Sequence, residues 1–205
     1  MKRHDLIINR ILHLFEIRRI KTKEKVVFLT FDDGPEPDIA DFVLTELRKY
    51  NAKATFFCKG ENAEKYPDLL RSITADGHTL GNHTYSHINC LNTPTKEYMT
   101  DVEKADKIIN SNLFRPPWGC INVSTFLKLI KKYKIVYWSL ISGDTDMNKF
   151  DEEKSLNNLK SKTRSGDIVL FHFCLRHEKE TKILLTKYLE WIYQNGYRSE
   201  AIKNN

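Results

Sequence analysis

The sequence predicts an α/β fold with a parallel sheet, either open or closed into a barrel. Short apolar runs alternate with segments whose apolar residues recur every three to four positions, giving about seven strands and about six helices. The 205 residues, 40% of them hydrophobic, suffice for one sizeable core and are too few for a two-domain enzyme. No internal repeat or low-complexity linker divides the chain. We therefore expect one compact α/β domain.

The first half of the chain shows the alternation most clearly. Continuous apolar runs predict strands at residues 26–31 and 53–58, and a shorter extended piece is expected at 77–80. A helix is predicted after Pro37, and another at 63–75, because their apolar residues keep helical spacing. Each strand is thus followed by a segment able to cover the sheet.

The second half continues the pattern. The predicted strands are 113–115, 135–140 and 167–173. The predicted helices are one capped by Thr95 and running to Ile109, one capped by Ser124, one at 152–162, and one at 182–193 that Gly196 ends.

The positive charge of the chain is concentrated in residues 1–25. The net charge is +6, and this segment alone carries eight basic and three acidic side chains, which leaves +1 for the rest. A body so close to neutral lacks the basic face that nucleic-acid binding requires. We therefore expect no nucleic-acid partner.

The same segment is predicted to form a basic amphipathic helix. One side would gather Ile7, Ile8, Ile11, Leu12, Leu14 and Phe15, and the other Asn9, Arg10, His13 and Glu16. Such a helix packs its apolar face on the barrel or on a second chain, or lies on an anionic membrane surface, to which basic residues attract it. We therefore divide the chain into this N-terminal helix, 1–25, and a main domain, 26–205.

Cysteine usage and hydropathy indicate the cellular compartment in which the protein is expected. Four widely spaced cysteines are expected to be free thiols: Cys58, Cys90, Cys120 and Cys174. No apolar stretch approaches 18 residues, and the N-terminus lacks the features of a secretory signal. These observations predict a cytoplasmic protein, and the membrane alternative for residues 1–25 would add weak peripheral contact with the inner membrane face.

Polar clusters follow five of the predicted strands. In chain order they are Asp32 with Asp33, His83 with His87, Arg115, Asp144, and His172. Because the C-terminal ends of parallel strands share one face of an α/β fold, the clusters are expected to converge where such folds place their active sites.

Each cluster has a chemical and a structural interpretation. Two histidines four residues apart are common on surfaces and in cores, but with a carboxylate they form a three-ligand metal set that leaves one position open for water. The pair Asp32 and Asp33 suits a turn, or a division of roles in which one carboxylate binds the metal and the other accepts a proton. His172 suits a buried structural histidine, or an acid whose pKa Asp144 raises and which protonates a leaving amine.

These segments resemble the motifs of the polysaccharide deacetylase family, carbohydrate esterase family four. Residues 30–35, 82–87, 115–119 and 170–172 are similar to its first, second, third and fifth motifs, and residues 54–57 and 77–81 to its connecting segments. The resemblance covers roughly residues 26 to 200. It implies a distorted (β/α)7 barrel, with a catalytic domain over 26–205.

The resemblance also implies a role for each site residue. The metal ligands would be Asp33, His83 and His87, holding one divalent ion, zinc first, with cobalt, iron or another divalent ion as alternatives. Asp32 would be the general base oriented by Arg115, and His172 the general acid tuned by Asp144. Substrate would contact Pro117, Trp118 and Leu170, with the last two lining an acetyl pocket and a backbone N–H near Trp118 stabilising the oxyanion.

The fourth and fifth motifs depart from the family pattern. Thr145 stands where the family commonly has Trp, Ile141 where an acidic residue is frequent, and Phe173 where Asp usually follows the acid histidine. The proposed metal and acid–base residues are all retained. The departures therefore concern substrate shape and the tuning of His172 more than the reaction.

The expected function is a metal-dependent hydrolase that removes an N-acetyl group from an amino sugar in an oligosaccharide, polysaccharide or glycan precursor. An alternative is a deformylase or deacetylase of a lipid-linked sugar at the cytoplasmic membrane face, suggested by residues 1–25. A non-catalytic carbohydrate-binding relic would have no need for both Asp32 and His172. An iron oxygenase with two histidines and one carboxylate usually has an all-β fold, which the alternating pattern disfavours.

Overall fold

The structure is a computed structural model that describes residues 15–145 and 150–204. Its strands are β1 (Glu16–Ile17), β2 (Val26–Asp32), β3 (Ala54–Cys58), β4 (Thr79–Asn82), β5 (Leu113–Phe114), β6 (Lys134–Val136), β7 (Leu140–Ile141), β8 (Ile168–His172) and β9 (Arg198–Ser199). They pair in parallel in the order β1-β6-β5-β4-β3-β2-β8-β7, with β9 added to β2.

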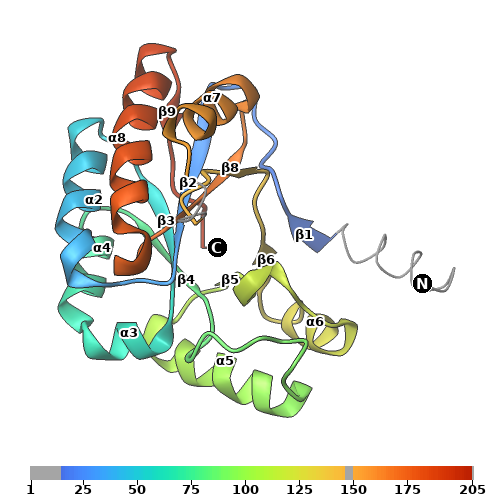
Figure 1. Cartoon of the computed structure of the whole chain (residues 1–205). Coiled ribbons are helices and arrows are strands. Elements are labelled where there is room, and N and C mark those ends of the chain that lie inside the picture. The colour runs from blue at the N-terminus through green and yellow to red at the C-terminus, as the bar shows by residue number, and fades with distance from the viewer. Residues whose placement is uncertain (1–14, 146–149, 205) are drawn as a thin grey trace, which may run out of the picture.

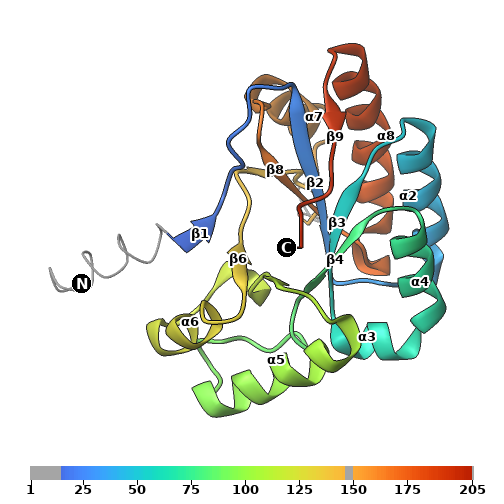
Figure 2. The same cartoon turned by 180° about the vertical axis from the view of Figure 1, so that it is seen from behind.

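Helices lie outside the curl of this sheet (Figures 1 and 2). They are α2 (Pro37–Lys49), α3 (Gly60–Lys65), α4 (Pro67–Ala75), α5 (Thr95–Ile109), α6 (Val123–Leu129), α7 (Glu152–Lys162) and α8 (Glu178–Gln194), with short 3-10 helices η2 (Pro117–Gly119) and η3 (Leu175–His177). The predicted α/β class is confirmed, and the barrel implied by the resemblance takes the form of a curled, half-closed parallel sheet. Within the described ranges, no helix is long and apolar enough to cross a membrane.

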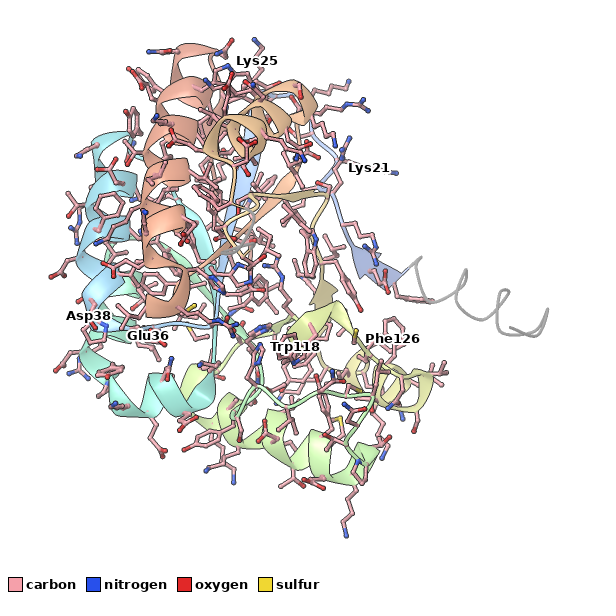
Figure 3. The ribbon with its side chains drawn as sticks, in the orientation of Figure 1. Lys21, Lys25, Glu36, Asp38, Trp118 and Phe126 are labelled. Carbon is pink, nitrogen blue, oxygen red and sulfur yellow. The ribbon has the colours of Figure 1, made fainter. Side chains whose placement is uncertain are left out.

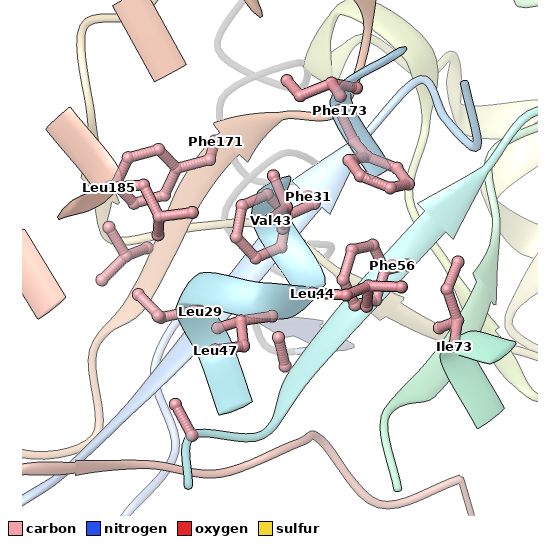
Figure 4. Packing of buried hydrophobic residues seen from close by; sticks show 14 of the residues in the cluster. Leu29, Phe31, Val43, Leu44, Leu47, Phe56, Ile73, Phe171, Phe173 and Leu185 are labelled. Atoms are coloured by element: carbon pink, nitrogen blue, oxygen red, sulfur yellow. The ribbon is translucent and has the colours of Figure 1, made fainter. Parts of the chain in front are cut away.

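The core lies between the central strands and the outer helices α2, α4 and α8. Every residue of β2 and β3 is buried, as expected for parallel strands covered on both faces. Figure 4 shows Phe31 and Phe56 on these strands packed below Val43 of α2, and the two rings stack with centroids 5.0 Å apart. This apolar layer fixes the carboxyl ends of the strands.

Phe173 closes the core directly below the first polar cluster. Its ring is fully buried and packs edge-on against Phe56, with centroids 5.0 Å apart. A Cβ placed on Gly34 would overlap this ring and lie 2.8 Å from the carbonyl oxygen of Phe173. Where Asp is usual in the family, this chain therefore has a core aromatic residue that requires glycine opposite it.

Gly34→Ala is expected to lower the free energy of unfolding by about 1–3 kcal/mol, because the added methyl group has no space beside Phe173. Gly196→Ala is the control, since its Cβ would meet nothing closer than 4.0 Å and the substitution carries only the cost of a positive φ of 74°. Urea unfolding measures both variants. Equal losses would show that the contact with Phe173 does not limit position 34.

The strand predicted at 135–140 is wrong as a single element. The chain forms β6, leaves the ladder after Val136, and re-enters it as β7 on the opposite edge of the sheet. The buried guanidinium of Arg115 donates to the carbonyl oxygens of Val136 (Nε, 3.1 Å) and Tyr137 (Nη2, 2.9 Å). These carbonyls are thereby diverted from strand pairing, and the break follows.

The sheet starts earlier in the chain than residue 26. Within the segment predicted as an N-terminal helix, Glu16–Ile17 form β1 and pair with β6, and the backbone N–H of Ile20 donates to Gly166 (2.9 Å). The rest of the helix predicted for residues 7–16 lies outside the described residues. The described end of the basic segment is thus an edge of the sheet.

Helix boundaries differ from the predictions where prolines and caps decide them. The helix predicted at 63–75 is two helices, because Pro67 has no N–H to continue α3 and instead opens α4. The helix predicted to be capped by Ser124 is capped two residues earlier by Asn122, whose side chain accepts from the N–H of Thr125 (2.9 Å). Thr95 likewise lies inside α5 and makes no cap.

The C-terminal tail enters the curl of the sheet (Figure 1). The N–H of Ile202 donates to Oγ1 of Thr55 (2.8 Å), and its side chain packs with Val26, Phe28 and Val136. The amino ends of the strands are therefore filled by apolar side chains, and the open cleft lies at their carboxyl ends.

Candidate active site

The polar clusters converge at the carboxyl ends of the strands. Asp32 and His172 end the neighbouring strands β2 and β8, where they are register partners, and His83 follows β4 directly. Around them lies a cleft of about 610 Å³. Its lining brings together side chains from predicted clusters far apart in the sequence: Asp32, Asp33, His83, His87, Trp118, Leu170 and His172.

Three side chains at the floor of the cleft could hold a metal ion. Oδ1 of Asp33 lies 3.7 Å from Nε2 of His83 and 3.1 Å from Nε2 of His87, and one donor atom from each residue fits within 4.8 Å of the others. This Asp33 oxygen is buried and accepts no hydrogen bond from the described part of the chain. Burial would raise the pKa of Asp33, but the two histidines hold it well below its usual range. An ionised carboxylate facing two imidazoles fits a divalent cation.

The tautomer of His83 also fits a metal. Its Nδ1 lies 2.8 Å from the carbonyl oxygen of Arg115, which can only accept, so Nδ1 carries the proton. Nε2 is then left with a free lone pair directed toward Asp33. A backbone partner on the distal nitrogen is the usual way in which a ligating histidine is oriented.

The loop that carries His87 is held from the neighbouring helix. The carboxylate of Asp101 in α5 accepts from the backbone N–H groups of Tyr85 (2.7 Å) and Ser86 (3.0 Å). His87 itself has φ of 57° and Asp33 has φ of 77°, conformations that cost energy outside glycine. Such strain persists only where surrounding contacts impose it, and here it turns both side chains to the same point.

Asp32 points to a buried arginine. Nη1 of Arg115 donates to Oδ1 of Asp32 (2.7 Å) and to Oγ1 of Thr30 (2.8 Å), and neither charged group is exposed. The other carboxylate oxygen of Asp32 lies 3.9 Å from Nε2 of His83. Asp32 is therefore fixed beside the candidate metal position without being one of the three clustered donors.

His172, beside Asp32 at the strand ends, is paired with a buried carboxylate. Its Nδ1 lies 3.0 Å from Oδ1 of Asp144, whose second oxygen accepts from the backbone N–H of His172 (2.7 Å) and from Thr181 (3.0 Å). Burial alone would lower the pKa of His172, but the hydrogen bond and charge of Asp144 raise it to about 9. Near neutral pH, His172 is thus a protonated acid facing the cleft.

A model of the polysaccharide deacetylase family matches residues 19–138, more than half of the chain. The chain belongs to this family. Its relatives include a peptidoglycan-N-acetylglucosamine deacetylase of Bacillus cereus, 34% identical over 87% of each chain, and a chitooligosaccharide deacetylase of Azorhizobium caulinodans, 31% identical over 78% of this chain and 79% of the other.

A solved structure agrees with this assignment. The peptidoglycan N-acetylglucosamine deacetylase Bc1960, in complex with 4-naphthalen-1-yl-N-oxidanyl-benzamide, superposes with a TM-score of 0.85 at 30% identity, covering 92% of this chain and 91% of the other. The polysaccharide deacetylase fold thus accounts for nearly the whole chain.

The three residues expected to contact substrate differ in position. Trp118, labelled in Figure 3, is 63% exposed in η2, with its ring 5.1 Å from that of His87. Leu170 is buried and lines the cleft, whereas Pro117 is buried and does not line it. Ile141 and Thr145, two of the departures from the family pattern, also line the cleft. They are placed to alter its shape.

Sequence reasoning missed a group of cleft residues that have no motif. Glu36, Lys59, Cys174, Arg176 and His177 all line it. Three of them follow the same strand end as His172, so their position after a polar strand terminus was an available signal. Lys59 directly follows β3, and Glu36 lies four residues after Asp32 at the end of β2, so the same signal was available for both.

Asp144→Asn is expected to move the alkaline limb of the pH–activity profile of this family member toward lower pH. A general acid acts while protonated, so if His172 fills that role, activity is lost as pH rises through its pKa of about 9. Without the Asp144 charge, burial dominates, and the limb should move from about 9 toward the ordinary value of 6.5 or below. Rates of acetate release between pH 5 and 10 test this. An unmoved alkaline limb would show that Asp144 does not raise the pKa of the group that acts as the acid.

Proposed function

We propose that this chain is a metal-dependent N-deacetylase of amino-sugar glycans. The observation that carries the proposal is the meeting, in one cleft, of the Asp33–His83–His87 cluster with Asp32 and His172. Relatives 34% and 31% identical carry the names of peptidoglycan and chitooligosaccharide deacetylases. The substrate class is therefore N-acetylglucosamine-containing glycans.

Asp33, His83 and His87 would hold one divalent ion, with zinc as the first candidate. One carboxylate and two imidazoles form a donor set common to zinc and also accepted by cobalt or iron. The ion supplies Lewis acidity, polarising the amide carbonyl and easing deprotonation of water. The orphaned oxygen of Asp33 and the fixed tautomer of His83 support this assignment.

Asp32 is the general base. Its hydrogen bond to Arg115 directs one oxygen away from the cleft, and the other faces His83, where it can take a proton from an attacking water. Arg115 holds the carboxylate in this orientation, and Thr30 accepts a hydrogen bond from the same guanidinium. Arg115 is thus a positioning residue.

His172 is the general acid, at the end of the strand next to that of Asp32. Amide hydrolysis needs a proton on the leaving nitrogen, and the Asp144 pair keeps this imidazole charged until the carbon–nitrogen bond breaks. The acetyl group would lie against Leu170 and Trp118, between base and acid.

Acetate release tests the function directly. Purified protein loaded with zinc is incubated with chitooligosaccharides, peptidoglycan fragments, and nucleotide- or lipid-linked N-acetyl sugars, with a chelator-treated sample as the control. We expect acetate from at least one glycan, and none after chelation. A metal-loaded protein that binds these glycans and releases no acetate would be a carbohydrate-binding relic.

Location and membrane contact stay predictions. All four cysteines are unpaired, which supports a cytoplasmic setting. Weak contact with the inner membrane face through residues 1–25, and with it a lipid-linked substrate, rests on the charge of that segment. Co-sedimentation with anionic vesicles at low and high salt tests it, against a chain that starts at Glu24. Equal recovery of both proteins in the supernatant at low salt would refute the contact.

A further inference from the structure

A second histidine lies beside the acid, and nothing in the chemistry above uses it. His177 ends η3, five residues after His172, and lines the cleft. The two rings meet edge to face with centroids 5.4 Å apart. The imidazole of His177 is only 7% exposed. It therefore forms part of the wall next to the proton donor.

This buried imidazole lacks polar partners. Nδ1 of His177 is buried without a hydrogen bond, and neither ring nitrogen bonds to a residue in the described ranges. Buried polar atoms usually have partners, and one left open in a site calls for an explanation. Among the described side chains with such an atom, two line the cleft: Asp33 and His177. The proposed metal accounts for Asp33, and His177 remains.

The segment that carries His177 is anchored. The N–H of Leu175 donates to Oε2 of Glu36 (2.6 Å), and the N–H of His177 donates to the carbonyl of Cys174 (3.2 Å). Burial lowers the pKa of His177, and the charge on His172 lowers it further, so the ring stays neutral. A neutral imidazole has one donor and one acceptor nitrogen and suits a hydroxyl group.

The proposed substrate brings hydroxyl groups to this part of the cleft. In the proposed reaction the nitrogen leaves toward His172, so the amino sugar that bears it lies beside that residue. A glycan sugar carries hydroxyl groups on several of its ring carbons. A group packed against His172 and lining the cleft is therefore placed to bind one of them.

We propose that His177 binds the sugar itself: its imidazole hydrogen-bonds a hydroxyl of the amino sugar and so selects acetylated sugars over other acetyl compounds. The inference rests on the proposed function. It assigns a specificity-determining residue on the leaving-group side of the cleft.

The test compares a glycan with an acetyl compound that has no sugar. We measure kcat/KM of the zinc-loaded wild type and of His177→Phe on a chitooligosaccharide and on 4-nitrophenyl acetate. Phenylalanine keeps an aromatic ring against His172 and removes both nitrogens. We expect a loss of about threefold to tenfold on the glycan, the usual effect of one neutral hydrogen bond, and less than about twofold on the ester. His177→Gln, which retains a donor and an acceptor, should recover part of the glycan activity.

A structural role would give a different result. His78 is a matched control, since it is equally buried, has an unpartnered Nε2, packs on the ring of Phe56 and lies outside the cleft. His78→Phe should leave the ratio of glycan to ester activity unchanged, whatever it does to stability. If His177→Phe loses kcat/KM equally on both compounds, or loses none on the glycan, this inference is wrong and the proposed function still stands. A wild type that releases acetate from no glycan would overturn the proposed function, and this inference with it.

Discussion

Replacing His83 or His87 with alanine is expected to remove the bound divalent ion and the deacetylase activity together. Each variant leaves two of the three protein donors. The affinity for the divalent ion should fall by at least about 100-fold, because loss of groups that only orient a metal ligand already lowers metal affinity 10- to 100-fold. Asp33 Oδ1 would then face one imidazole in place of two. Metal analysis of protein dialysed against a weak chelator, with acetate release on the same samples, measures both effects.

The control for this experiment is a histidine outside the cleft. His78→Ala removes another buried imidazole, whose Nδ1 accepts from the N–H of Ala54 (3.2 Å), and should keep about one equivalent of metal. A full equivalent retained in both His83→Ala and His87→Ala would show that the ion is held elsewhere. Loss of metal from His78→Ala as well would indicate general unfolding, which circular dichroism would detect.

The parts of the site that sequence reasoning found are those that follow strands. Asp32, His83, Arg115 and His172 each come at or just after the carboxyl end of an apolar run. Parallel pairing takes all such ends to one side of a sheet, so their meeting needs no knowledge of register. The alternation of strand-like and helix-like segments is visible in the local sequence. The prediction that these residues meet was therefore correct even where the predicted element boundaries were wrong by several residues.

Features that depend on distant partners could not be predicted in the same way. Val136 and Tyr137 look like strand residues, and only the guanidinium of Arg115 reaching their carbonyl oxygens interrupts the strand. Thr181, in the first turn of α8, contributes a hydroxyl to Asp144 that no local pattern marks. β1 is two residues long, and its pairing with β6 is set by tertiary contacts.

Asp32→Asn is expected to keep the metal and lose on the order of 10² to 10⁴ in turnover. The amide has the size of the carboxylate and its oxygen can still accept from Nη1 of Arg115, but it cannot take a proton from water. The metal donors Asp33, His83 and His87 are untouched.

The remaining concern is that Arg115 loses a buried counter-charge. Breaking such a pair can cost about 3–5 kcal/mol when no partner replaces it. Here Thr30 and two backbone carbonyls still accept from the guanidinium, so we expect a smaller loss and a folded protein.

Asp167→Asn separates the loss of a general base from the loss of stability that follows when a buried ion pair is broken. Asp167 is equally buried and pairs with Arg19 (2.6 Å), next to the amino end of β8 and away from the cleft. It should lower the free energy of unfolding and leave turnover within about twofold. Metal content, thermal unfolding and acetate release are measured for both variants. If Asp32→Asn loses its metal, Asp32 is a metal ligand. If it keeps both metal and turnover, the general base is another residue. If Asp32→Asn and Asp167→Asn lose turnover equally, the loss reflects stability and the assignment of Asp32 as the base fails.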